Sequence, residues 1–145
     1  MQLQASTDMS RRYFEASIQR GNAVENPAAM KNYLSLELRL YAREVFAMFS
    51  LDTRHRAISF DKLFFGTLNS TNVYPREIVK KALKHNAAAV VFAHNHPSGI
   101  AEPSIQDKNI TKRLKSALSL VDIKVLDHIV VGDGETVSLA ERGLR

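Results

Sequence analysis

Two histidines, one residue apart, follow an apolar run in the segment "FAHNHPSGIAEPSIQD", which spans residues 92–107. Because side chains two residues apart in a strand point to the same side, His94 and His96 can turn together while Asn95 turns away. Pro97 then stops the strand. Neutral imidazoles on one side of a strand end are suited to binding a metal ion.

Asp107, eleven residues after the second histidine, lies where the helical pattern calls for an apolar side chain. Ile110 and Leu114, three and seven residues later, belong to the same stripe. A carboxylate that faces inward must be paired or bound to a metal, because a buried unpaired charge is costly. Two imidazoles and one carboxylate form a three-ligand set that leaves zinc a fourth position for water.

The nature of the ion is less constrained than its ligands. Calcium would need more carboxylates and no imidazoles. Manganese, iron and nickel accept the same ligands, so zinc is favoured by ligand type and availability alone. The simpler alternative is that His94 and His96 are loop histidines and that Asp107 is a helix-start acid favoured by the helix dipole.

The elements that position these residues follow from hydrophobic periodicity and turn signals. Asn26 and Pro27 suit the start of the first helix. The pattern predicts helices over 27–40, 74–86 and 102–121, and strands over 45–52, 57–65 and 87–93, with two more around a Gly-Asp-Gly turn within 123–143. This order predicts an α/β (α+β) domain over 26–145, preceded by an arm or short helix over 1–25.

Composition sets broad limits on the class of protein. The sequence has 145 residues, 45% of them hydrophobic, and carries a formal net charge of +5. It contains no cysteine, which excludes disulfides, thiolate metal sites and cysteine nucleophiles. It shows no secretory signal and no apolar run of membrane-spanning length, so we expect a cytoplasmic protein with no membrane partner.

The spacing His94-x-His96-x7-Ser104-x2-Asp107 resembles the JAMM motif of MPN/JAB-domain metalloenzymes. The segments "GTLNS", "YPREIVKKAL", "HNAAAVVFAHNHPSG" and "VLDHIVVGDG" resemble the RadC family in particular. The resemblance implies an MPN/JAB-like mixed β-sheet flanked by helices, with cytidine-deaminase-like layering. It also implies zinc on the two histidines and the aspartate of a hydrolase or peptidase-like site. Longer RadC proteins have an N-terminal helix-hairpin-helix region with no counterpart here, so we expect no DNA binding through such a region.

The resemblance further implies a catalytic glutamate just before the first core strand, where this sequence has Glu44. A carboxylate there can take a proton from metal-activated water and pass it to the leaving group. The alternative is a solvated acid paired with Arg43 or Arg39. Glu77 is the second candidate for the base, although an acid in the first turn of a helix is already explained by the helix dipole.

Two further residues have less specific signals. Ser104 lies three residues before Asp107, so its hydroxyl can donate to an oxyanion beside the metal. A serine that caps the helix explains it nearly as well. His128 is interpreted as a core histidine or one that supports a ligand.

Three functions are compatible with these patterns. The first is a zinc-dependent hydrolase that cleaves an amide or isopeptide bond of a peptide or protein substrate. The second is a DNA-repair-associated DNA-binding protein with a structural metal, whose weak nucleic-acid contacts would use basic residues of two helices (Lys80, Lys81, Lys84; Lys108, Lys112, Arg113, Lys115). The third is an inactive interaction module. The sequence leaves the substrate and the oligomeric state open.

Overall fold

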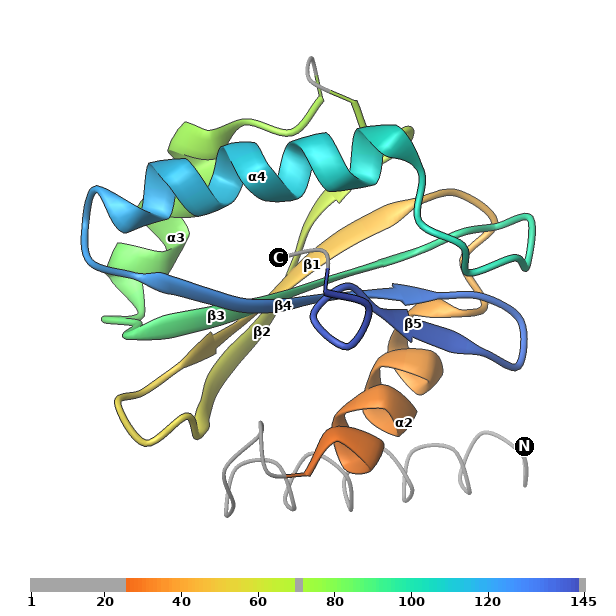
Figure 1. Ribbon diagram of the computed structural model, residues 1–145, viewed down its shortest axis with the longest axis horizontal. Helices are drawn as coiled ribbons and strands as arrows, with labels where there is room; N and C mark the ends of the chain where they lie inside the picture. The colour runs from red at the N-terminus through yellow and green to blue at the C-terminus, as the bar shows by residue number, and fades with distance from the viewer. Residues whose placement is uncertain (1–25, 70–71, 144–145) are drawn as a thin grey trace.

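A mixed five-stranded sheet in the order β2-β1-β3-β4-β5 forms the centre of the computed structural model, which describes residues 26–69 and 72–143 (Figure 1). The elements in chain order are α2 (Pro27–Leu38), β1 (Val45–Leu51), β2 (Ala57–Phe65), α3 (Pro75–Lys84), β3 (Ala89–Asn95), α4 (Ile105–Ser119), β4 (Lys124–Val131) and β5 (Thr136–Ser138). This confirms the predicted α/β class with a mixed sheet flanked by helices. The predicted arm over 1–25 lies outside the described residues.

The sheet is mixed because one connection crosses over. Strand β3 pairs with β4 in parallel through the crossover helix α4, and the other neighbouring strands pair antiparallel. Helices α3 and α4 cover one face of the sheet, and α2 covers the other (Figure 1). Strands β1 and β3 are buried along their whole length, as their continuous apolar sequences predict for strands covered on both faces.

The predicted element boundaries hold to within a few residues, with two differences that affect the site. Strand β3 continues through Asn95, so His94 lies inside the strand, where it pairs with Phe46 of β1 and Val130 of β4. Helix α4 begins at Ile105 rather than near Pro103, because Ser104 serves as its N-cap. No helix in the described part of the chain has the length and apolar character needed to cross a membrane.

Candidate metal centre

His94, His96 and Asp107 come together where β3 ends and α4 begins. The Nε2 atom of His94 lies 3.1 Å from Asp107 Oδ1 and 3.0 Å from His96 Nε2, and His96 Nε2 lies 3.0 Å from Asp107 Oδ2. Zinc–nitrogen bonds of about 2.0–2.1 Å in a tetrahedral site place neighbouring ligand atoms about 3.4 Å apart. The three side chains are therefore positioned to bind a metal ion, with shifts of only a few tenths of an ångström.

Asp107 enters the site because it lies on the face of α4 that is turned toward the sheet. It is buried on the same face as Ile110, Leu114 and Leu118, as the helical pattern predicts. Its carboxylate also accepts a hydrogen bond from the backbone N–H of Ser104 at 2.8 Å. The capping of α4 and the orientation of this ligand are thus achieved by the same side chain.

His96 is oriented by the loop that follows it. Its Nδ1 lies 2.8 Å from the carbonyl oxygen of Ile100, to which it donates as Nδ1–H, so the Nε2 lone pair faces the cluster. The loop packs closely against the end of β4. A side chain at Gly132 would bring its Cβ to 2.5 Å from the carbonyl oxygen of Gly99, so only glycine permits this approach.

The ionisation of the cluster follows from these contacts. The hydrogen bond to Asp107 raises the pKa of His96 above its usual value, against the effect of burial, and the charge of Glu44 contributes to the same rise. Burial on its own raises the pKa of Asp107, but hydrogen bonds with His94 and His96 outweigh it and hold that pKa well below its usual range. The site thus keeps a carboxylate ionised and holds a positive charge beside it, whether a proton or a metal.

Glu44 lies in the segment that leads into β1, where the family pattern placed it. Its Oε2 accepts a hydrogen bond from the backbone N–H of Leu68 at 2.6 Å, which fixes a half-buried carboxylate. Glu77, the second candidate for a base, is exposed on α3 and lies 3.8 Å from Lys80. Of these two acids, Glu44 is the one whose charge acts on His96.

Ser104 performs the structural role considered for it. Its Oγ accepts a hydrogen bond from the backbone N–H of Asp107 at 3.0 Å, which completes a capping box with the Asp107 carboxylate. The side chain is exposed, and no acceptor for its hydroxyl proton is recorded within the described residues. An oxyanion contact from this hydroxyl stays a prediction.

The structure adds two residues that the sequence analysis did not select and gives His128 a definite place. His128 is buried, and its Nε2 lies 2.7 Å from His94 Nδ1. Burial lowers the pKa of His128 well below its usual value, so it is neutral. Thr111 contacts His128, and Asn95 contacts the backbone beside Glu44. Thr111 lies four residues after Asp107 on the same helix face, a spacing that could have identified it.

Comparison with known proteins places this geometry in a family. The model of the RadC-like JAB domain matches residues 24–144. The chain belongs to the RadC-like JAB domain family. Relatives named UPF0758 protein are 59% identical over 143 residues in Cellvibrio japonicus, 57% in Nitrosococcus oceani and 55% in Tolumonas auensis. In each case the match covers 99% of this chain and 64% of the relative. This RadC-like domain is thus similar to somewhat under two thirds of those longer proteins.

Proposed function

We propose that this RadC-like domain is a zinc-dependent hydrolase of the JAMM type that cleaves an amide or isopeptide bond in a peptide or protein. The observation that carries the proposal is the convergence of His94 Nε2, His96 Nε2 and the Asp107 carboxylate within 3.0–3.1 Å of one another. At that distance the two ring nitrogens share either a proton, as a hydrogen bond, or a metal ion. Imidazole and carboxylate ligands in this number favour zinc.

The surrounding residues support hydrolysis over a purely structural metal. Structural zinc sites are closed by four protein ligands, whereas catalytic sites use three and keep one position for water. When bound, zinc would lower the pKa of a coordinated water to about 7 and so supply a nucleophile at neutral pH. His94 and Asp107 are buried, while His96 keeps a side-chain exposure of 13%, so the cluster is open to solvent on the His96 side.

Glu44 is proposed as the general base. Its carboxylate is held by Leu68 and is close enough to influence the pKa of His96. It would take a proton from the attacking water and deliver it to the leaving nitrogen. Ser104 is proposed to donate its free hydroxyl proton to the oxyanion that forms on the substrate carbonyl.

The competing DNA-binding proposal has weaker support. Lys80 and Lys81 on α3 lie 3.8 Å from Glu77 and Asp61, respectively, so part of their charge is already compensated. Such pairs are common on a solvated helix face. We keep weak nucleic-acid contact through α3 and α4 as the alternative.

Hydrolysis by purified protein tests the proposal. A panel of fluorogenic peptides and isopeptide-linked peptides is incubated with zinc-loaded protein, with chelator-treated protein, and with treated protein resupplied with zinc. The proposal predicts cleavage that chelation abolishes and zinc restores. Absence of cleavage of every substrate by fully zinc-loaded protein, together with tight DNA binding, would contradict it.

A further inference from the structure

A closed circuit of hydrogen bonds runs behind His94, on the side away from the ligand cluster. The Thr111 hydroxyl donates to the carbonyl oxygen of Asp107 at 2.7 Å, and Thr111 Oγ1 lies 2.6 Å from His128 Nδ1. His128 Nε2 then lies 2.7 Å from His94 Nδ1. The circuit begins at the backbone carbonyl of Asp107 and returns to the same residue, because the Asp107 carboxylate lies 3.1 Å from His94 Nε2.

The direction of each hydrogen bond in the circuit follows from the first. A hydroxyl has one proton, and Thr111 gives it to the Asp107 carbonyl, so Thr111 must accept from His128 Nδ1–H. Within the described residues no carboxylate contacts the buried His128 ring, so a second ring proton would leave a buried charge unpaired. With its proton on Nδ1, His128 accepts at Nε2 from His94 Nδ1–H. Nε2 of His94, which faces the ligand cluster, is then the nitrogen left to bind a metal ion.

A β-bulge in β4 turns His128 toward His94. Val90 pairs with Val125, but Val91 pairs with Asp127, so Leu126 is an extra residue on β4. Regular alternation from Val125 would place His128 on the α2 face of the sheet. The bulge reverses the alternation and puts His128 on the face covered by α4, where Thr111 lies. Bulges are found where a strand must redirect a side chain near a functional site.

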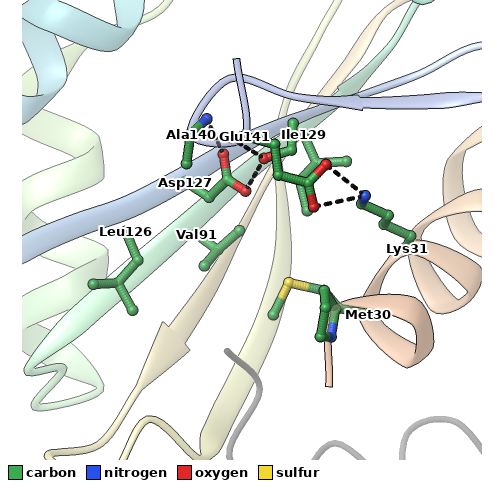
Figure 2. A pocket seen from close by; sticks show the side chains of 10 residues that line it. Met30, Lys31, Val91, Leu126, Asp127, Ile129, Ala140 and Glu141 are labelled. Carbon is green, nitrogen blue, oxygen red and sulfur yellow. Dashed lines mark hydrogen bonds and ion pairs between the residues drawn. The ribbon is translucent and has the colours of Figure 1, made fainter. Parts of the chain in front are cut away.

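The residue beside the bulge secures this arrangement from the opposite face. The Asp127 carboxylate accepts hydrogen bonds from the backbone N–H groups of His128 at 2.7 Å and Ala140 at 3.0 Å, and from the Ser138 hydroxyl at 2.5 Å. Figure 2 shows Asp127 beside Ala140 in a hollow that also contains Met30 of α2. The position of His128 is therefore fixed on both faces of the sheet.

We propose that Thr111 and His128 are positioning residues that hold His94 as the Nδ1–H tautomer and so present its Nε2 to the metal. The inference rests on the proposed metal site, because only a metal gives the tautomer a function. Which ring nitrogen of a histidine binds a metal is set by the hydrogen bond that the other nitrogen makes. Such supporting contacts typically alter metal affinity by about 10–100-fold.

The tautomer itself can be measured without any metal. Histidine 15N–1H NMR correlations of the unmodified, chelator-treated protein at pH 8 identify the protonated nitrogen of each ring. We expect the proton of His94 on Nδ1, with His128 likewise protonated on Nδ1. A His94 ring protonated on Nε2 and not on Nδ1 would overturn the inference. This result is independent of the proposed function, since a correct tautomer in a protein that binds no zinc would refute only the metal site.

Matched variants of His128 test the effect on metal binding. In His128→Gln the amide oxygen can still accept from His94 Nδ1–H, whereas His128→Leu keeps an apolar side chain of similar bulk and accepts nothing. Zinc affinity is measured by competition with a chromogenic chelator, on variants whose folding is checked by thermal denaturation. We expect His128→Leu to bind about 10–100-fold more weakly than wild type, and His128→Gln to recover most of that loss.

Phe92 provides the packing control, because it pairs with His128 in register and its ring contacts the His128 ring at a centroid distance of 6.1 Å. Phe92→Leu disturbs this packing and leaves the circuit intact, so we expect near-normal zinc affinity. Equal losses in Phe92→Leu and His128→Leu, or in His128→Gln and His128→Leu, would overturn the inference.

Variants of Thr111 give a second test that does not depend on whether the His128 variants fold. Thr111→Ser keeps the hydroxyl, and Thr111→Val replaces it with a methyl group. We expect the valine variant, and not the serine variant, to lose zinc affinity and to show a mixed His94 tautomer by NMR. Wild-type affinity together with a pure Nδ1–H tautomer in Thr111→Val would remove Thr111 from the proposal.

Discussion

The side-chain oxygen of Asn95 accepts a hydrogen bond from the backbone N–H of Val45 at 2.6 Å. The amide nitrogen of the same side chain donates to the carbonyl oxygen of Arg43 at 3.0 Å. The residue between the two histidines therefore holds the backbone on both sides of Glu44. Through Asn95, the strand that carries the imidazoles also fixes the segment that carries the proposed base.

Replacing Asn95 with alanine should separate metal binding from catalysis. The variant leaves the buried N–H of Val45 without its acceptor, which costs about 1–3 kcal/mol of unfolding free energy. We expect zinc content to stay near wild type and kcat to fall, because Glu44 is no longer held. Ser50→Ala is the control, since the buried Ser50 hydroxyl has no hydrogen-bond partner recorded in the described residues. Unchanged kcat in a less stable Asn95→Ala would contradict a link to Glu44.

Glu44→Gln tests the proposed base directly. Glutamine keeps the shape of the side chain and an oxygen that can accept from Leu68 N–H, and it loses the ability to take a proton. We expect unchanged zinc content and a fall in kcat on the order of 10²–10⁴-fold. Glu77→Gln should be as active as wild type. The reverse pattern, an active Glu44→Gln and an inactive Glu77→Gln, would identify Glu77 as the base.

Zinc affinity should depend on pH through His96. The pKa of His96 is raised in the metal-free folded protein. Protonated His96 therefore contributes its full share of the folding free energy below its pKa in the unfolded chain, about 6.5. That contribution is lost as the pH rises through the raised pKa of the folded protein. Zinc must displace that proton, so affinity should increase as pH rises through the same range, by up to about tenfold per unit below the raised pKa.

Competition titrations between pH 6 and 9 measure this dependence. His55→Asn, in the turn between β1 and β2, is the control, because it removes a histidine remote from the cluster and asparagine tolerates the positive φ of that residue. Its curve should match wild type. A pH-independent zinc affinity in the wild-type protein would contradict the assignment of His96 as a ligand that is protonated without metal.

The order of elements could be predicted from sequence because it depends on local patterns. Pro27 and Pro75 mark helix starts, and the continuous apolar runs of β1 and β3 mark strands buried on both faces. The metal ligands could also be predicted from the sequence, because Asp107 is a charged residue at a position of the helix where the pattern calls for an apolar one. These signals need only a few neighbouring residues to be recognised.

The support behind the ligands could not be derived in the same way. The role of His128 depends on a bulge at Leu126, which exists only in the pairing between β4 and β3. Alternation along the β4 sequence would assign His128 to the wrong face. The hydrogen bond between the Asn95 side chain and the backbone N–H of Val45 joins residues 50 apart in the sequence, and no local pattern indicates such a contact.

DNA binding and hydrolysis predict opposite mutant sensitivities. If α3 binds DNA, affinity falls steeply with salt, and reversing the charges of Lys80, Lys81 and Lys84 to glutamate flattens that slope. We instead expect weak binding, micromolar or poorer at physiological salt, and amide cleavage that His94→Ala abolishes and the lysine reversals leave unchanged. Fluorescence anisotropy over a salt series and the hydrolysis assay, run on the same variants, distinguish the two. Tight, metal-independent DNA binding that the lysine reversals abolish, with no peptide hydrolysis, would favour the alternative.

Metal content is the measurement closest to the central claim. Elemental analysis of protein purified under metal-replete conditions should give one zinc per chain in the wild type. His96→Ala should retain far less, because three protein ligands leave none to spare. Ser50→Ala, treated in parallel, should keep the full complement. Equal zinc in wild type and His96→Ala, or no metal in either, would contradict a metal centre at His94, His96 and Asp107.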